Sequence, residues 1–197
     1  MPAPTVFHPD ADLPAIAGTR TGPLLIVGPG ACAFDDLGSY PWVDHDVMVV
    51  NLMGVFFPEF DHWTSIHSEV FHTMERLRFT EPWRFGTKHG YERHTKQGSK
   101  TEVPVNYWPI SGHFAPVSGV TAAIIGVALG YDRVVLAGIP ADDSGHFYGF
   151  HGEGARVIDH GEQSSKEAWS RCREEYFEGK VTSLSGNTRE WLGSPDE

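Results

Sequence analysis

The stretch from Ser118 to Pro140, "SGVTAAIIGVALGYDRVVLAGIP", constrains the fold more than any other part of the chain. Its first half carries apolar residues at helical spacing, so one face of a helix is expected to be buried. Its second half contains "VVLAG", a short apolar run typical of a strand covered on both faces. Gly130 lies between the two and can end the helix, because glycine takes the left-handed conformation that ends many helices. A buried helix that leads into a buried strand is typical of a parallel sheet.

Ser118 and Gly119 open the expected helix, where the first backbone N–H groups have no partner within the helix. A serine there commonly caps the helix. The same position can also bind an anion or a ribose, because several N–H groups point outward together. The cap is the more common role, and at this point both interpretations stay open.

Other short apolar runs alternate with glycine and polar residues along the chain. Strands are predicted in "PLLIVGPGA" (23–31), "HDVMVVNLMG" (45–54), "DHWTSIHSE" (61–69), "VPVNYWP" (103–109) and "KVTSL" (180–184). The charged segment 164–179 predicts an amphipathic helix, capped by Ser165 and burying Ala168, Trp169, Cys172 and Tyr176. A turn and a short helix are expected after the last strand.

This alternation predicts an α/β fold: an open, mostly parallel, Rossmann-like sheet with helices on both faces. No internal repeat or linker divides the chain, so a single domain is expected over residues 1–197. Residues 1–22, rich in proline, alanine and glycine, are expected to lie across the surface. The polar and basic segment 86–102 is expected to be a mobile loop.

The net charge of −11 argues against a duplex nucleic acid partner, which requires clustered lysine and arginine. Cys32 and Cys172 are too few to form a disulfide framework, so a reduced, cytoplasmic protein is expected. No signal peptide opens the chain, and no apolar run approaches the roughly 20 residues that span a bilayer. A membrane partner is therefore not expected.

Small and polar residues follow the predicted strands. They are Gly28 and Gly30, Asn51, His67 and the segment 138–143. Ligands of open parallel sheets bind beyond the carboxyl ends of the strands, so these residues predict a nucleotide site. The glycine turn lacks the full G-x-G-x-x-G spacing, and Asn51 stands where a dinucleotide site would carry an acidic residue. The pattern is therefore not that of an NAD site.

Five stretches in order resemble a known family. They are "LLIVGPGACAFDDL", "DVMVVN", "WTSIHSE", "SGVTAAIIGVALGYDRVVLAGIPADDSGHFYGF" and "VIDHGEQSSKEAW". The chain is similar to the bacterial CMP-sialic acid-dependent sialyltransferases, glycosyltransferase family 42, and to the related 6-hydroxymethylpterin diphosphokinase-like proteins. The resemblance spans residues 23–192 loosely and is strongest over 118–150 and 157–170.

The resemblance implies a role for each residue that matches the family pattern. Gly28 and Gly30 match the glycine turn on the phosphate side, and Asn51, Ser118 and Gly119 match nucleotide contacts. His67 stands where the sialyltransferases have a second nucleotide-contacting asparagine. Tyr148 matches a tyrosine that hydrogen-bonds the phosphate, and His160 matches the histidine proposed as general base.

The chain departs from the family at two positions near Gly138. Pro140 stands where the family has an aspartate, and Asp142 stands where it has another phosphate-contacting tyrosine. Asp142 and Asp143 are candidates to replace the missing carboxylate, to contact the nucleotide or to bind Mg²⁺. They are equally consistent with an ordinary turn in "PADDSG". No histidine or cysteine spacing indicates a zinc site.

Three functions are consistent with the sequence. The first is a small glycosyltransferase of phage or bacterial type, which would transfer a sugar from a nucleotide-linked donor to an acceptor hydroxyl with inversion. The second is a nucleotide-dependent pyrophosphokinase-like transferase. The third is a nucleotide-binding module without catalysis, which the loss of the aspartate at Pro140 favours. The expected partner is a small nucleotide-linked molecule, and a homo-oligomer stays open.

Overall fold

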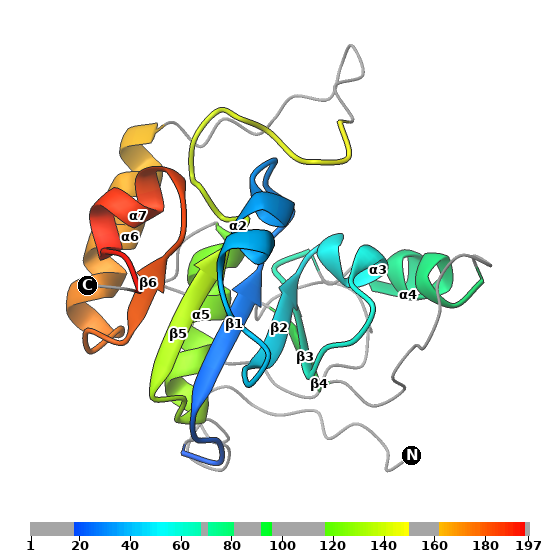
Figure 1. The fold of residues 1–197 in the computed structure, drawn as a ribbon, viewed down its shortest axis with the longest axis horizontal. Coiled ribbons are helices and arrows are strands. Elements are labelled where there is room, and N and C mark those ends of the chain that lie inside the picture. The colour runs from blue at the N-terminus through cyan, green and yellow to red at the C-terminus, as the bar shows by residue number, and fades with distance from the viewer. Residues whose placement is uncertain (1–17, 68–70, 81–91, 96–116, 150–161, 196–197) are drawn as a thin grey trace.

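One parallel sheet organises the part of the chain that the structure describes (Figure 1). This computed structural model describes residues 18–67, 71–80, 92–95, 117–149 and 162–195. The six strands lie in the order β4-β3-β2-β1-β5-β6, and every pair is parallel. Their bounds are β1 Pro23–Val27, β2 Asp46–Val50, β3 His62–Ser65, β4 Glu92–Thr95, β5 Arg133–Ala137 and β6 Val181–Ser183.

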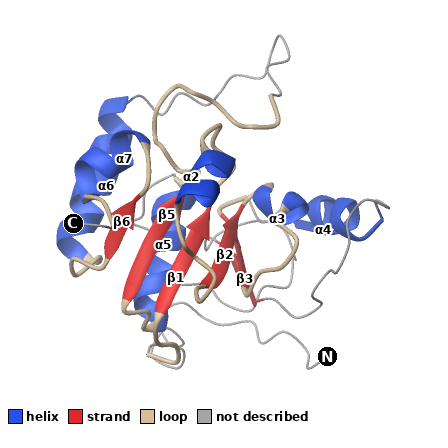
Figure 2. Cartoon of the chain, viewed as in Figure 1, coloured by secondary structure: helices blue, strands red, loops and turns tan. Residues whose placement is uncertain are grey.

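Helices cover both faces of this sheet, as Figure 2 shows. One face carries α5 (Ser118–Leu129), α6 (Glu162–Glu175) and α7 (Gly186–Leu192). The other carries α2 (Ala33–Ser39), α3 (Met53–Phe56) and α4 (Phe71–Thr80). The predicted fold class is confirmed. Among the described helices, none is long and apolar enough to cross a membrane.

Alternating side chains of β1 divide the apolar core into two layers. Leu24 and Ile26 belong to the cluster under α5 and α6, whereas Leu25 and Val27 belong to the cluster under α2 and α3. All four side chains are fully buried. Successive residues of a strand point to opposite faces, so a strand buried on both sides must be apolar throughout. This explains the continuous run "LLIV".

Helix α5 follows the prediction closely. Gly130 ends it in the left-handed conformation (φ 104°), and its N–H donates to the carbonyls of Gly126 and Val127. Small residues let the helix approach the sheet, since a Cβ on Gly126 would lie only 2.7 Å from the Leu24 side chain. Strand β5 follows at Arg133, and it pairs with β1 along its whole length.

Two local predictions differ from the structure. Residues 92–95 form the edge strand β4 inside the segment predicted as a loop over 86–102, whose remaining residues lie outside the described ranges. The predicted strand 103–109 and most of the surface segment 1–22 also lie outside them. Helix α6 begins at Glu162, so Ser165 lies within the helix and is not its cap. Trp169 and Cys172 are fully buried, as predicted.

Candidate functional site

Three polar side chains meet where β2, β3 and α5 reach the carboxyl edge of the sheet. Asn51 Oδ1 accepts hydrogen bonds from the Ser65 hydroxyl (2.8 Å) and from the Ser118 hydroxyl (3.2 Å). Both serines are buried, whereas Asn51 is half-buried. Within the described residues, the Asn51 amide nitrogen has no hydrogen-bond partner. The cluster therefore presents an amide donor beside the start of a helix.

The backbone of Asn51 explains why an asparagine can end β2. Asn51 has a left-handed φ of 52°, which asparagine tolerates better than most residues. Its N–H donates to the Thr64 carbonyl (2.9 Å), and its carbonyl accepts from Trp63 Nε1 (2.7 Å). These two bonds to β3 fix the backbone of Asn51, and with it the direction in which the Asn51 side chain leaves the turn.

Ser118 is the first residue of α5, and its hydroxyl does not cap the helix. The N-cap is Val117, which makes no capping bond through its side chain, and Ser118 donates to Asn51 instead. The structure therefore joins two residues that the sequence singled out separately. Ser65 was missed by the sequence reasoning, although its place at the end of a predicted strand was a usable signal. His67 is exposed, and its backbone N–H donates to Ser65 Oγ (2.9 Å).

The glycine turn after β1 packs tightly on the backbone that follows β5. The N–H of Gly28 donates to the Ala137 carbonyl and that of Gly30 to the Gly138 carbonyl, both at 2.8 Å. A Cβ on either glycine would lie within 2.7 Å of the Gly138 carbonyl oxygen. Close packing therefore requires glycine at both positions. Their N–H groups are already engaged inside the protein.

Ile139 connects this turn to the start of α5. A Cβ on Gly28 would overlap the Ile139 side chain, and a Cβ on Gly119 would lie 2.8 Å from Ile139 Cγ2. The same apolar side chain thus fills the space beside both glycines. The turn and the helix start are neighbours at the carboxyl edge, as the parallel topology predicts.

A buried acidic side chain, which the sequence reasoning missed, ties these loops together. Asp36 Oδ2 accepts from the Gly138 N–H and from the Ser185 hydroxyl, each at 2.8 Å. Cys32 Sγ lies 3.0 Å from Ser185 Oγ. Because the serine hydrogen points to Asp36, the Cys32 thiol is the donor to Ser185. Partial burial, and to a smaller extent the charge of Asp36, raise the pKa of Cys32 to about 11.

Tyr148 lies in a group of aromatic rings. Its ring stacks on Phe56 (centroids 6.3 Å, 15° between planes) and meets the edge of Phe147 at 5.3 Å. Burial raises the pKa of the Tyr148 phenol, so the hydroxyl keeps its proton at neutral pH. A protonated phenol can donate a hydrogen bond to an anionic oxygen.

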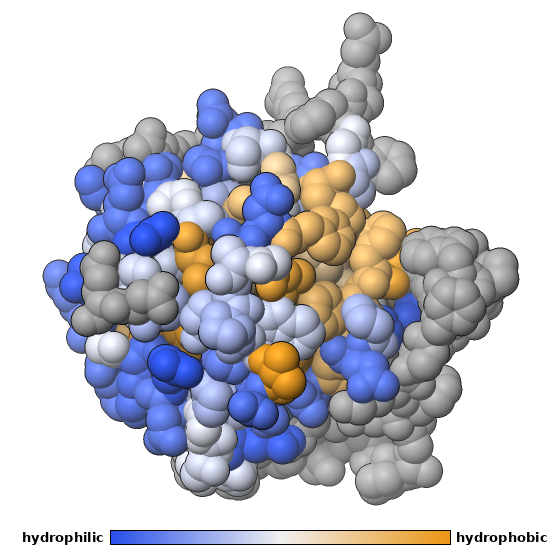
Figure 3. All heavy atoms as spheres, viewed as in Figure 1, coloured by the Kyte–Doolittle hydropathy of each residue, from blue (hydrophilic) through white to orange (hydrophobic). Residues whose placement is uncertain are grey.

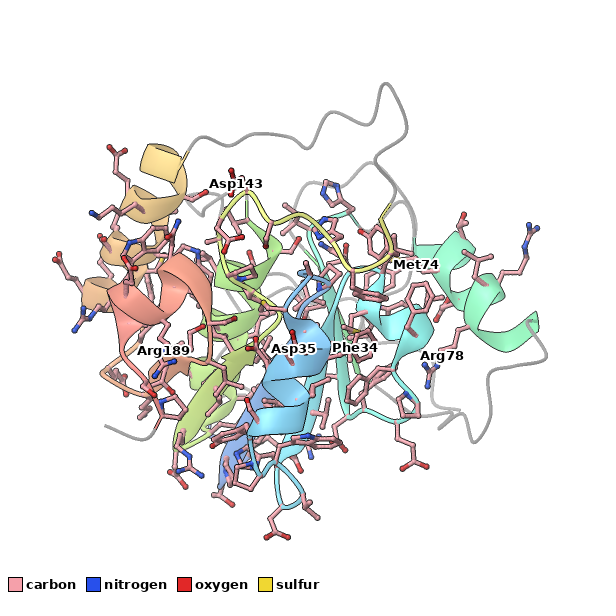
Figure 4. All side chains as sticks on the ribbon, turned by 45° about the horizontal axis from the view of Figure 1, so that its top comes forward. Phe34, Asp35, Met74, Arg78, Asp143 and Arg189 are labelled. Carbon is pink, nitrogen blue, oxygen red and sulfur yellow. The ribbon has the colours of Figure 1, made fainter. Side chains whose placement is uncertain are left out.

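The two aspartates after Pro140 are exposed. Asp142 Oδ1 accepts from the Ser144 N–H (2.9 Å), which is the bond of an ordinary Asx turn. Figure 4 shows Asp143 on the loop that follows β5. In the described ranges, no three histidine, cysteine or acidic residues are grouped so that they could hold a metal ion. His160 lies outside these ranges.

Comparisons with known proteins identify a similar fold but do not identify a family. No protein-family model matches the chain, and no curated protein matches it in sequence. One similar solved structure is a variant of the sialyltransferase CST-II in complex with CMP, with a TM-score of 0.59 and 14% identity. The match covers 86% of this chain and 85% of that chain.

A second similar structure is the sialyltransferase CstII from Campylobacter jejuni in complex with a substrate analogue, cytidine-5'-monophosphate. Its TM-score is 0.55 at 16% identity, over 87% of this chain and 84% of that one. The chain therefore has a fold like that of these sialyltransferases.

Proposed function

We propose that this protein is a glycosyltransferase that binds a nucleotide-activated sugar at the carboxyl edge of its sheet. The observation that carries the proposal is the likeness, over most of both chains, to a sialyltransferase whose structure holds CMP. The Asn51–Ser118 contact supports it, because it sets polar donors at the edge where parallel sheets bind ligands.

In this proposal the nucleotide is bound by side-chain donors and by a helix terminus. The Asn51 amide donates to the ribose or the base, because its oxygen is already occupied by Ser65 and Ser118. The N–H groups at Gly119 and the following residues of the twelve-residue helix α5 attract an anionic group. His67 and Asp142 are further nucleotide contacts in this proposal, whereas Gly28 and Gly30, whose N–H groups are engaged within the protein, shape the turn beside them.

The transfer step follows from the residues that the family resemblance assigns. An acceptor hydroxyl attacks the anomeric carbon of the donor sugar while the bond to the phosphate oxygen breaks, which inverts the configuration. His160 takes the hydroxyl proton as general base. The phosphate oxygen leaves with the bonding electron pair, and Tyr148 donates a hydrogen bond to the departing group.

A specific observation favours a second candidate, a nucleotide-binding module without transfer. Pro140, which replaces the aspartate of the family, is buried. A Cβ on Gly30 would lie 2.6 Å from Pro140 Cδ, and a Cβ on Gly186 would overlap Pro140. Two glycines thus pack around this residue, which fills the position with apolar atoms.

Binding is tested by a thermal-shift panel of CMP, UMP, GMP, AMP and CMP-sialic acid, with and without Mg²⁺. A ligand at 100 times its dissociation constant stabilises the protein by about 2.7 kcal/mol. We expect the cytidine nucleotides to give the largest shift. A Mg²⁺ dependence that disappears in Asp142→Asn would assign a cation to that turn. A chain that binds none of these ligands would contradict the proposal.

Catalysis is tested by His160→Ala. Loss of a general base lowers the transfer rate about 10²–10⁴-fold, and the affinity for the nucleotide should stay unchanged. His45→Ala is the control, since it removes an imidazole next to Asp46, the first residue of β2, at the opposite edge of the sheet. Wild-type transfer by His160→Ala would refute the catalytic role. Nucleotide binding by a wild-type protein that transfers nothing would favour the binding module.

A further inference from the structure

An exposed aromatic surface borders the glycine turn, and Tyr148 is the one residue of it that has a role in the proposed transfer. Phe34 of α2 is 57% exposed and Phe56 of α3 is 38% exposed. Both rings meet Phe147 in edge-to-face contacts, with centroids 5.0 and 5.2 Å apart, and Phe56 stacks on Tyr148. Figure 3 shows apolar surface gathered over α2 and α3. We call these four residues the aromatic platform.

Backbone hydrogen bonds fix the aromatic platform to the glycine turn. The Phe147 N–H donates to the Pro29 carbonyl at 3.1 Å, and the Ala31 N–H donates to the Gly145 carbonyl at 3.0 Å. Gly30 and His146 form an antiparallel bridge between these bonds. The aromatic platform therefore lies directly beside the glycine turn, at the carboxyl edge of the sheet. A sugar leaving a phosphate at this edge would meet its acceptor here.

We propose that the aromatic platform binds the acceptor, and that the acceptor is an uncharged sugar. This inference rests on the proposed function. One face of a hexose ring exposes C–H bonds, whose partial positive charge is attracted to the negative face of an aromatic ring. The hydroxyl groups point away from such a contact, so one remains available for attack. The exposed carboxylate of Asp35, next to Phe34 on α2 (Figure 4), can accept hydrogen bonds from the others.

The size and charge of the surface favour a sugar over larger partners. A phenylalanine presents roughly 150–250 Å² when exposed, so Phe34 and Phe56 together offer on the order of 200 Å². A stable interface with a second copy buries about 800 Å² on each partner. The protein carries a net charge of −11, which opposes attachment to an anionic lipid surface. A single sugar ring matches the area.

The test measures binding to an array of neutral glycans built from glucose, galactose, N-acetylglucosamine, lactose and maltose. The full chain is applied with and without saturating CMP, as wild type, Phe34→Ser and Phe56→Ser. Val43→Ser is the matched control, because Val43 is an apolar residue that is 87% exposed outside the platform. CMP affinity, sedimentation mass and binding to phosphatidylcholine vesicles are recorded for the same four proteins.

We expect wild type and Val43→Ser to bind the same neutral glycans, and each phenylalanine variant to bind them about tenfold more weakly with unchanged CMP affinity. Wild-type binding by the phenylalanine variants, or no glycan bound by wild type, overturns the inference. A phenylalanine-dependent change in mass or in vesicle binding also overturns it, in favour of a second copy or a lipid surface. If wild type binds the glycans but no nucleotide, the proposed function fails while the sugar platform stands.

Discussion

At the amino edge of the sheet, the Tyr131 hydroxyl is hydrogen-bonded to two polar side chains, Asp46 and His62. The hydroxyl donates to Asp46 Oδ2 at 2.6 Å and lies 2.8 Å from His62 Nε2. Because the single hydroxyl hydrogen points to Asp46, His62 is the donor to Tyr131. At the carboxyl edge, Asn51 accepts from two serines, and its amide nitrogen bonds to nothing in the described part of the chain.

The difference separates groups that stabilise the fold from the groups that we propose bind the nucleotide. His62 and Tyr131 are fully buried, so an unpaired donor there would cost about 1–3 kcal/mol. Burial and the hydrogen bond to Asp46 raise the pKa of Tyr131, which keeps its hydroxyl protonated as the donor. Asn51 is half-buried, and water can satisfy its amide until a ligand replaces it.

The largest effect on stability is expected from Asp36→Ala, which tests an exception to the division between the two edges. Asp36 lies at the carboxyl edge, yet it is buried and pairs with Gly138 and Ser185. Its loss leaves two donors unpaired, so we expect about 3 kcal/mol of destabilisation and a melting temperature lower by about 6–12 °C. Asp35→Ala, an exposed change on the same helix, is the control. Equal melting temperatures for the two variants would contradict the structural role of Asp36.

The next effect is expected from Tyr131→Phe. The change removes the acceptor of the buried His62 donor, so we expect about 2 kcal/mol of destabilisation and a fall of about 4–8 °C in melting temperature. CMP affinity should not change. Tyr148→Phe makes the same chemical change at the carboxyl edge, where we expect slower transfer and a melting temperature within about 2 °C of wild type. A larger fall in melting temperature for Tyr148→Phe than for Tyr131→Phe would contradict the distinction between the two edges.

The fold could be predicted from local signals, because short apolar runs in the sequence mark the strands and the helices that bury them. The run "VVLAG" and the glycine at position 130 predicted β5 and the end of α5, and both are confirmed. Strand β4 could not be found in the same way. Its residues Glu92–Thr95 read "ERHT", and their strand conformation comes from pairing with β3.

The candidate site could be predicted only in part, since its contacts join residues distant in sequence. The end of a predicted strand indicated Asn51 and the start of a predicted helix indicated Ser118, but their hydrogen bond spans 67 positions. Asp36 carried no signal, because a carboxylate on a short helix is usually exposed and its partner Ser185 lies 149 positions away. The glycine turn was interpreted as a phosphate contact. Its packing against Gly138 gives a second reason for glycine that no local pattern reveals.

A smaller effect on stability, together with a loss of nucleotide binding, is expected from Asn51→Gly. Glycine accepts the left-handed φ of 52° without strain, so the variant loses the amide while the turn is kept. We expect CMP affinity to fall about tenfold and the free energy of unfolding to fall by about 1–2 kcal/mol, because the buried hydroxyls of Ser65 and Ser118 lose their acceptor. Asn51→Ala should lose the same affinity and a further ~1 kcal/mol of stability, because a Cβ strains this backbone. Unchanged CMP affinity in both variants would remove Asn51 from the site.

The smallest effect concerns the Cys32 thiol, which lies at the carboxyl edge but belongs to the closed network of Asp36 and Ser185. Its pKa is raised from 9.0 to about 11, chiefly by burial. Only the thiolate reacts with iodoacetamide, so at pH 8 we expect alkylation about a hundredfold slower than in the urea-unfolded chain. Mass spectrometry of the labelled peptide measures both rates.

The pH dependence of that reaction gives its own check. In the folded protein the alkylation rate should rise tenfold per pH unit up to about pH 11, whereas in the unfolded chain it should level off near pH 9. The folded state holds this proton more tightly than the unfolded state. The stability that Cys32 contributes is therefore fully present below pH 9 and is lost as the pH rises through 11. Folded protein that alkylates at the unfolded rate near neutral pH would show an accessible thiol of ordinary pKa, which would contradict the burial of Cys32 in the network of Asp36 and Ser185.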